Sequence, residues 1–313
     1  MRYGAAETQE VQEQMTAPAP PSWPYDEMLT AEGDVRSHYQ GLHQRITTLA
    51  ADEMSERQRT LERYFLLQGI TFTVYGGESS TERIIPTDLL PRIIPAAEWL
   101  RIETGLTQRL RALNMFLADI YGAQQILMDG VVPRELVLGA PSYRREMLNL
   151  YVPHQAYANV CGSDLIRQPD GAFAVLEDNL RVPSGVSYML ANREASRRTF
   201  PGSFRAAGVR AIDRYPDLLL ATLKSMAADW RPHPQIVVLT PGVYNSAYYE
   251  HAYLARLMGC PLVEGRDLVV HDNCVYMRTT TGLRRIDVIY RRVDDDFIDP
   301  LTFRRDSSLG VAG

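Results

Sequence analysis

Two carboxylates and an amide stand at the end of an apolar run in the stretch VLEDNLRVPSG. Glu177 and Asn179 are two residues apart, and because side chains alternate along a strand, both are expected on one face. An Asp-Gly pair at 170–171 separates this run from another that contains Asp164, a pattern typical of a β-hairpin. If the pair forms a two-residue turn, Asp164 lies directly opposite Glu177. The sequence therefore predicts that the three side chains converge.

Oxygen ligands of this kind suit Mg²⁺ or Mn²⁺ better than Zn²⁺. Facing carboxylates repel each other unless a proton, an arginine or a cation neutralises them. Since Mg²⁺ is commonly shared with substrate phosphates, the pattern indicates a nucleotide site. Just beyond, Arg181 offers a guanidinium, and the turn at Ser184 and Gly185 offers backbone N–H groups to anionic oxygens. The alternative is a solvated hairpin face with Arg181 as a surface partner.

Helices and short strands are expected around this hairpin. Helical patterns cover 35–67 and 95–122, and in the second the apolar residues recur every three or four positions. Between them, alternating residues up to Val74 predict a short strand that leads into a mobile loop at Gly76–Gly77. A further helical stretch covers 216–230.

A second unit follows the break RPHP. An apolar strand, a Thr-Pro-Gly turn, a helix ended by Gly259 and another apolar strand predict a βαβ unit. A hairpin and a further strand, which ends at Arg291, come next. We place a domain boundary near Arg231, and the Pro-rich N-terminus is typical of disorder. The expected organisation is a disordered arm at 1–34, a helical segment with a metal-binding lobe at 35–230, and a βαβ substrate domain at 231–313.

Composition excludes several classes of protein. The chain has 313 residues, of which 45% are hydrophobic and 23% charged, as in ordinary soluble domains. Its net charge of −5, without a basic stripe, argues against a nucleic-acid partner. No 18-residue apolar segment and no apolar N-terminal region occur, so we expect no membrane span and no secretory signal, and a cytoplasmic location.

Five segments together resemble the circularly permuted ATP-grasp proteins of the type 2 group, relatives of glutathionylspermidine synthase. The resemblance runs from about residue 60 to the C-terminus. It implies a mixed fold (α+β / α/β), with a circularly permuted ATP-grasp core and a Rossmann-like pre-ATP-grasp unit. It also implies ATP and Mg²⁺ (or Mn²⁺), with a phosphorylated carboxylate that an amine then attacks. The segments are YGGESSTERIIPTDLLPRII, EWLRIETGLTQRLRALNMFLADIYG, VLEDNLRVPSGVSYMLANR, EHAYLARLMGCPLVEGRDL and IDVIYRRVDDDFIDPL.

The family's E-x-N metal motif falls on Glu177 and Asn179, and its upstream acid falls on Asp164. The resemblance thus implies the same three ligands that the hairpin pattern predicts. The phosphate contacts depart from the pattern, because Gly162 stands where the glutathionylspermidine synthases have an arginine. Arg167 is one expected replacement.

Arg181 is the other expected replacement, and we also expect it to be catalytic. With Arg167, the turn residues Ser184 and Gly185 complete the expected nucleotide contacts. The βαβ unit resembles the region that helps to hold substrates in unpermuted relatives. The alternatives are a structural role for His251 in its helix and a solvated loop around Asp295. The expected residues of this unit are Arg291 and Arg292 for catalysis, and Glu250, His251 and Asp295 for substrate binding.

ATP-grasp folds clamp the nucleotide between two lobes, and lysines usually contact it. Lys224 is the only lysine of this chain and lies in a predicted helix, so we expect a truncated product whose 231–313 unit is incomplete. Three functions fit: an ATP-dependent ligase for a small-molecule or peptide carboxylate and an amine, a non-catalytic binding module, and a Mg²⁺-dependent phosphotransferase or hydrolase. Pocket chemistry alone does not separate them.

Overall fold

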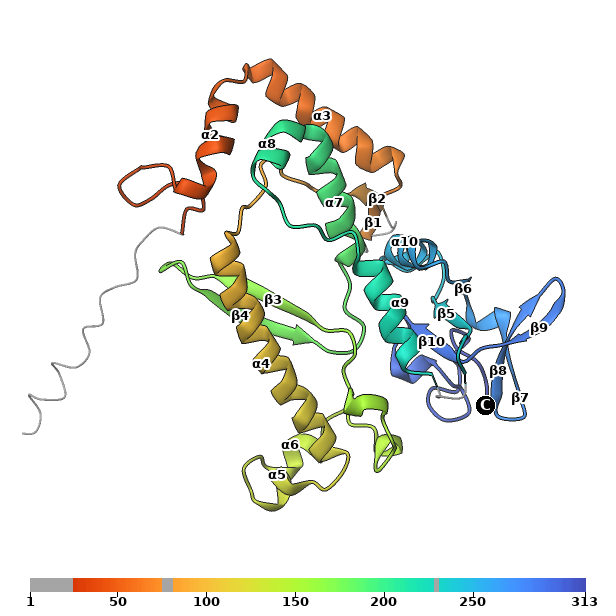
Figure 1. Ribbon diagram of the computed structural model, residues 1–313. Coiled ribbons are helices and arrows are strands. Elements are labelled where there is room, and N and C mark those ends of the chain that lie inside the picture. The colour runs from red at the N-terminus through yellow and green to blue at the C-terminus, as the bar shows by residue number, and fades with distance from the viewer. Residues whose placement is uncertain (1–24, 75–80, 228–230) are drawn as a thin grey trace, which may run out of the picture.

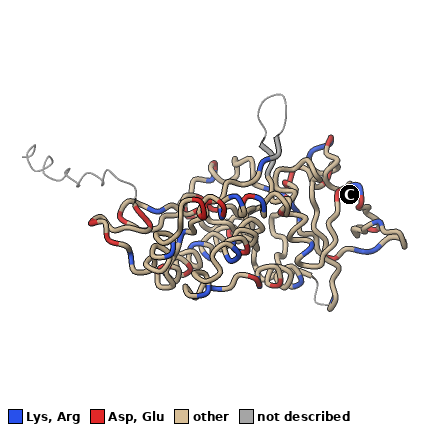
Figure 2. The backbone as a smooth tube through the Cα atoms, turned by 90° about the horizontal axis from the view of Figure 1, so that it is seen from above, with Lys and Arg blue, Asp and Glu red and all other residues tan. Residues whose placement is uncertain are grey.

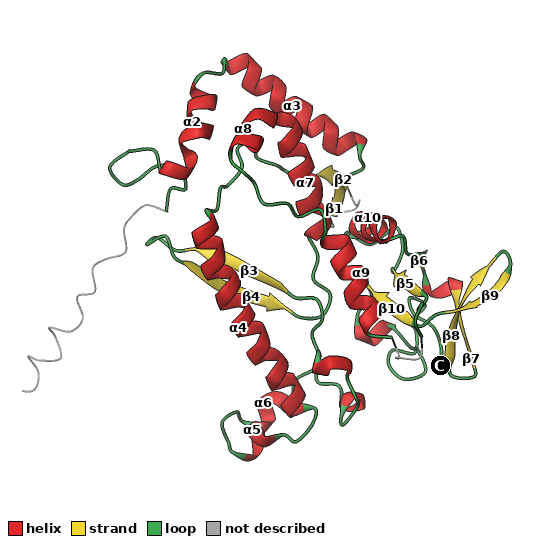
Figure 3. Ribbon diagram, in the orientation of Figure 1, coloured by secondary structure: helices red, strands yellow, loops and turns green. Residues whose placement is uncertain are grey.

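The computed structural model of the protein describes residues 25–74, 81–227 and 231–313 (Figure 1). The loop predicted at Gly76–Gly77 lies outside these residues. Helices and strands both contribute (Figure 3), which confirms the predicted mixed α+β class. Within the described ranges, no helix is both long and apolar enough to cross a membrane. In chain order the elements are η1 (Ser37–Tyr39), α2 (Gln40–Thr47), α3 (Ala51–Leu67), β1 (Thr71–Val74), β2 (Thr81–Ile84), α4 (Ala96–Ile120), α5 (Gln125–Met128), α6 (Arg134–Leu138), η2 (Arg145–Met147), η3 (Pro153–Gln155), β3 (Gly162–Arg167), β4 (Phe173–Asn179), α7 (Val186–Thr199), α8 (Pro201–Ala206), α9 (Tyr215–Ser225), β5 (Ile236–Leu239), α10 (Tyr248–Met258), β6 (Leu262–Val263), η4 (Gly265–Asp267), β7 (Leu268–His271), β8 (Cys274–Thr279), β9 (Gly282–Arg285), β10 (Val288–Arg291) and η5 (Asp295–Phe297).

The helix predicted at 35–67 consists of two α-helices, α2 and α3. The hydroxyl groups of Thr47 and Thr48 donate hydrogen bonds to carbonyls of α2, and such bonds compete with helix continuation. The chain then starts α3 with two acidic residues in its first turn, which the helix dipole favours. Leu61 and Phe65 of α3 pack against α7 and form one of the cores.

The predicted disordered arm at 1–34 needs a correction for residues 25–34. Leu29 pairs with Val35 in an antiparallel bridge, and Glu27 binds Arg167 of the hairpin at 3.0 Å. A Pro-rich composition indicates a weak tendency to fold, but it carries no information on a charged partner elsewhere in the chain.

The helix predicted at 95–122 is confirmed as α4, which lies across one face of the β3–β4 hairpin (Figure 1). Ion pairs fasten the two together. Arg167 of β3 binds Glu98 near the start of α4, and Arg109 of α4 binds Asp178 of β4 at 2.6 Å. α4 thus covers this face, while Asp164 and Glu177 of the hairpin are exposed.

The predicted βαβ unit is confirmed. β5 pairs in parallel with both β6 and β10, in the order β10-β5-β6, and α10 connects β5 to β6. Gly259 adopts φ +67° directly after α10, a left-handed position that favours glycine at a helix end. One face of β5, with Ile236 and Val238, packs on α9 and α10. The other face packs on β7, β8 and the segment near Val311.

The packing of α9 moves the boundary that we predicted near Arg231. Leu219 and Leu223 of α9 share a core with β5 and α10. The C-terminal packing unit therefore starts before Tyr215. The Arg-Pro-His-Pro break is a connection inside the unit, because a proline-rich break also occurs between a helix and the strand that it packs on.

We expect Leu254→Ala to lower the free energy of unfolding by about 2–5 kcal/mol, because Leu254 of α10 is 1% exposed in this core. Leu257 of the same helix is 42% exposed, so Leu257→Ala is the matched control and should cost less than about 1 kcal/mol. Urea unfolding monitored by circular dichroism measures both. Equal losses would contradict the packing of α10 described above.

Candidate metal and nucleotide site

The predicted β-hairpin forms, and Asp164 lies opposite Glu177. At the open end of the hairpin Gly162 lies opposite Asn179. The amide nitrogen of Asn179 donates a hydrogen bond to Oε1 of Glu177 at 3.1 Å, so these two side chains point the same way. The predicted convergence of two carboxylates and an amide is therefore confirmed.

The turn itself differs from the prediction. Gln168 donates its backbone N–H to the carbonyl of Ala172 at 2.8 Å, so the turn has three residues and not two. Its last residue, Gly171, adopts φ +86°, which glycine accommodates without strain. The longer turn shifts the register by one residue, and a β-bulge at Leu176 shifts it back before Glu177. The predicted pairing is correct because the two irregularities cancel.

The inner face of the hairpin carries a structural carboxylate. Asp178 is next to Glu177 in the sequence but points toward α4. Its carboxylate accepts a hydrogen bond from Ser163 of β3 at 2.7 Å and another from Arg109 of α4 at 2.6 Å. These hydrogen bonds, with that of Ser163 the larger effect, hold the pKa of Asp178 below its usual value. Asp178 is therefore occupied in fastening β4 to α4.

The outer face of the hairpin carries the candidate metal ligands. Asp164, Glu177 and Asn179 are all exposed. In the described ranges no group of three or more His, Cys, Asp and Glu side chains is arranged to hold a metal ion. The candidate set is thus two carboxylates and an amide. These donors fit Mg²⁺ when phosphate oxygens and water complete its coordination.

The turn after β4 binds an anion, and that anion belongs to the protein. The backbone N–H groups of Gly185 and Ser187, at the start of α7, donate to Oε2 of Glu250 at 2.7 and 3.1 Å. Gly185, which we predicted to contact the nucleotide, therefore has its N–H group engaged with Glu250. Ser184 remains exposed beside it.

Glu250, His251 and Arg292, which we predicted to act in substrate binding and catalysis, form a buried network. Their exposed fractions are 0%, 2% and 5%. Arg292 binds Oε1 of Glu250 at 3.1 Å and the hydroxyl of Tyr290 at 3.1 Å, while Nδ1 of His251 lies 2.9 Å from the hydroxyl of Thr240. Through these contacts the three side chains hold α7 and α10 to the sheet.

Asp295 lies at the centre of a cluster of arginines. Arg291 binds Oδ1 of Asp295, Nε of Arg144 lies 3.5 Å from Oδ2, and Nη1 of Arg181 lies 3.7 Å from it. Arg144 also binds Asp296 at 2.6 Å. Two residues predicted to be catalytic and one predicted to bind substrate thus meet. Sequence reasoning missed Arg144, which stands in a loop between α6 and β3 without a recognisable motif.

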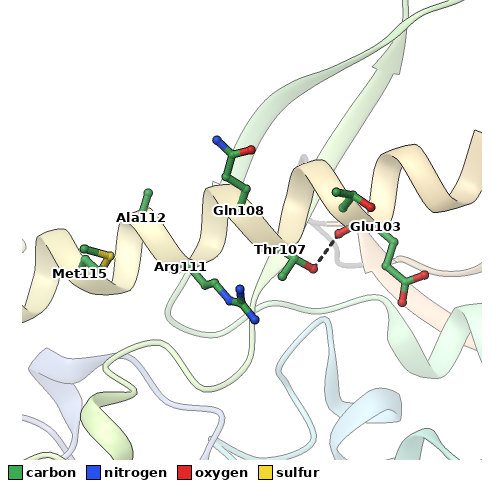
Figure 4. A pocket seen from close by; sticks show the side chains of 7 residues that line it. Glu103, Thr107, Gln108, Arg111, Ala112 and Met115 are labelled. Carbon is green, nitrogen blue, oxygen red and sulfur yellow. Dashed lines mark hydrogen bonds between the residues drawn. The ribbon is translucent and has the colours of Figure 1, made fainter.

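Charged residues of both signs are interspersed along the chain (Figure 2). A groove of about 550 Å³ lies on α4, and its lining side chains all come from that helix (Figure 4). There the hydroxyl of Thr107 donates to the backbone carbonyl of Glu103 of the same helix. A larger groove of about 1000 Å³ lies between α4 and the inner face of the hairpin. Neither groove includes the candidate metal ligands.

A family model described as a circularly permuted ATP-grasp matches residues 91–313. The chain belongs to this family. The family implies the use of ATP and a divalent metal ion, for which the outer hairpin face offers a suitable donor set.

Relatives come from several bacteria. An uncharacterized protein of Mycobacterium tuberculosis (strain H37Rv) is 53% identical over 289 residues, which cover 92% of this chain and 52% of that protein. An uncharacterized protein of Synechocystis is 47% identical over 289 residues, with 92% and 60% covered. A Frankia casuarinae protein named "Putative glutamate--cysteine ligase 2-2" is 42% identical over 291 residues, with 92% and 33% covered. The chain spans about half the length of the first of these relatives.

Gly162 departs from the ATP-grasp pattern for a steric reason. A Cβ atom at this position would lie 2.9 Å from Cβ of Pro183, closer than side chains tolerate. An arginine would force the segment after β4 to move. A glycine at position 162 therefore fits the close approach of Pro183.

Arg167, one of the expected replacements for that arginine, is engaged inside the fold. Its guanidinium binds Glu27 at 3.0 Å, binds Glu98, and lies 3.9 Å from the ring centre of Phe173. Its side chain is 6% exposed. The hydrogen bond that Arg167 donates to Glu98, the largest effect, raises the pKa of Arg167. Arg167 thus fastens the hairpin to α4, and its nucleotide contact stays a prediction.

We expect Glu250→Ala to lower the free energy of unfolding by about 3–5 kcal/mol. The substitution leaves the buried charge of Arg292 without its partner and removes the acceptor at the start of α7. The control is Glu194→Ala, since Glu194 pairs with two largely exposed arginines and should contribute less than about 1 kcal/mol. Chemical denaturation measures both variants, and similar losses would contradict the role of Glu250.

Acid should destabilise the protein through His251. Burial first, and then the charge of Arg292, lower the pKa of His251 to about 3, from 6.5 for the free side chain. Between these values the unfolded chain binds a proton that folded His251 does not. Lowering the pH through this window should therefore lower the free energy of unfolding by up to about 1.4 kcal/mol per pH unit. Denaturation of the wild type and of His251→Gln across this window measures the difference. Equal pH slopes in the two proteins would exclude this source of acid sensitivity.

Proposed function

We propose that the protein is an ATP-dependent ligase that joins a carboxylate to an amine, either by itself or as part of a longer chain like those of its relatives. The observation that carries the proposal is the outer hairpin face with Asp164, Glu177 and Asn179 in a chain of the ATP-grasp family. The name of the Frankia relative, a ligase for glutamate and cysteine, supports the same reaction class. The substrates would be a small-molecule or peptide carboxylate and an amine.

The three outer-face residues would hold Mg²⁺ or Mn²⁺ through their oxygens. A divalent ion bound there would neutralise negative charge on the phosphates of ATP. The hairpin positions these three side chains, because α4 holds its inner face and leaves them on the opposite face. A ligand set on paired strands is held more rigidly than one on loops.

Bond formation then takes two steps. The terminal phosphoryl group of ATP moves to a carboxylate oxygen of the substrate, which gives an acyl phosphate and ADP. The amine attacks the acyl carbon, loses a proton and expels inorganic phosphate. Arg181 and Arg291, whose side chains are 53% and 32% exposed, are the proposed groups that stabilise negative charge in these steps.

The test is calorimetric binding of the non-hydrolysable ATP analogue AMP-PNP, with and without Mg²⁺. We expect Mg²⁺-dependent binding that Glu177→Gln weakens at least about tenfold, because one charged ligand is lost. The matched control is Glu194→Gln, which neutralises a carboxylate of α7 that pairs with two exposed arginines and should leave binding unchanged. Equal weakening by both substitutions, or no dependence on Mg²⁺, would sink the proposed site.

Turnover distinguishes the alternative functions. A ligase releases phosphate from ATP only when carboxylate and amine substrates are both present. A phosphotransferase or hydrolase releases it, or transfers it, without an amine. A binding module binds AMP-PNP and releases no phosphate from ATP under either condition.

A further inference from the structure

Three arginines converge on one carboxylate in the Asp295 cluster, which consists of Arg144, Arg181, Arg291, Asp295 and Asp296. Two of the contacts to Asp295 measure 3.5 and 3.7 Å, at or beyond the limit of a hydrogen bond. The members come from three separate segments: the loop after α6, the segment after β4, and β10 with η5. Such a meeting of distant segments forms a potential binding site and not a local surface pair.

The guanidinium groups have more donors than the cluster uses. Each guanidinium carries several N–H donors, and all point in the plane of the group. Their acceptors within the described residues are the carboxylates of Asp295 and Asp296 and the carbonyl of Val293. Arg181 makes no contact shorter than 3.7 Å to any of these. A second carboxylate can therefore bind without displacing the first.

Stability explains only part of the cluster. The side chains of Arg181 and Asp296 are 53% and 58% exposed, and contacts this exposed contribute little to the free energy of folding. Those of Arg144 and Asp295 are 21% and 15% exposed, so the cluster has a largely buried side and an exposed side.

We infer that the Asp295 cluster binds the zwitterionic head of an amino acid or of a peptide substrate. The guanidinium groups of Arg144, Arg181 and Arg291 take its carboxylate, since arginine matches the planar geometry of that group. The carboxylates of Asp295 and Asp296 take its ammonium group. A site for a simple anion such as phosphate has no use for two aspartates, whereas a zwitterion needs both signs of charge.

The location of the cluster agrees with this role. Arg181 follows Asn179 by two residues, so their Cα atoms lie within about 7 Å of each other. A substrate held by its head at the cluster can thus extend toward the proposed nucleotide site. The inference rests on the proposed ligase function for the use of the bound substrate, but the binding itself is measured separately.

The experiment is calorimetric titration of the 313-residue chain with three ligands, with and without saturating Mg²⁺ and AMP-PNP. The ligands are L-glutamate, N-acetyl-L-glutamate, which lacks the ammonium group, and isoglutamine, in which an amide replaces the α-carboxylate. We expect both modified ligands to bind about ten- to a hundredfold more weakly than glutamate, because each loses charge-assisted hydrogen bonds.

Two variants test which side chains bind the ammonium group and which bind the carboxylate of the ligand. Asp295→Asn should weaken the binding of glutamate but not of N-acetyl-L-glutamate, which has no ammonium group for Asp295 to hold. Arg144→Gln should weaken glutamate and N-acetyl-L-glutamate but leave isoglutamine nearly unchanged. The control is Arg197→Gln, an arginine of α7 that is 59% exposed and paired with Glu194, which should affect none of the three.

Three results would overturn the inference. One is equal effects of Asp295→Asn on glutamate and on its N-acetyl form. Another is equal weakening by the Arg197→Gln control. The third is no binding of L-glutamate in the presence of bound AMP-PNP, a result that leaves the nucleotide site intact. If amino acids bind with the expected pattern and AMP-PNP does not, the ligase proposal fails and the amino-acid site stands.

Discussion

The carboxylate of Glu250 is the contact on which the rest of the structure depends. It is fully buried, and a buried charge is tolerated only when it is paired and hydrogen-bonded. One oxygen accepts from the start of α7, and the other accepts from Arg292 directly after β10. This single side chain therefore fixes the segment that follows the β3–β4 hairpin against the parallel sheet. Gly185, at φ +112°, lets the backbone approach this carboxylate.

The hairpin separates structural charge from functional charge by its two faces. The inner face uses Asp178 and Arg167 to hold α4, and the outer face leaves Asp164 and Glu177 exposed. The period of two residues along a strand makes this separation possible within the short stretch Glu-Asp-Asn. It also explains why the neighbouring acids Glu177 and Asp178 have different surroundings, one exposed and the other packed against α4.

Arginine performs several different tasks in a chain with a single lysine. Arg167 and Arg292 are buried and act as structural cross-links, since a guanidinium satisfies several acceptors at once. Arg181 and Arg291 remain partly exposed around Asp295 and keep donors available for a ligand. Exposure and the number of acceptors already present, and not residue type, distinguish the two groups.

The sequence alone determined the hairpin, the face shared by Glu177 and Asn179, the long helix α4 and the βαβ unit, because each follows from a local period or turn. It also determined the family. Only the tertiary structure decided which charges are used inside the fold. Gly185 meets Glu250 across 65 residues, and Arg144 meets Asp295 across 151. Local patterns carry no information about such partners, so Glu250, His251 and Arg292 resembled site residues in the sequence and proved to be buried. The bulge at Leu176 is likewise a tertiary outcome, since the register of β4 must match both the turn and the packing on α4.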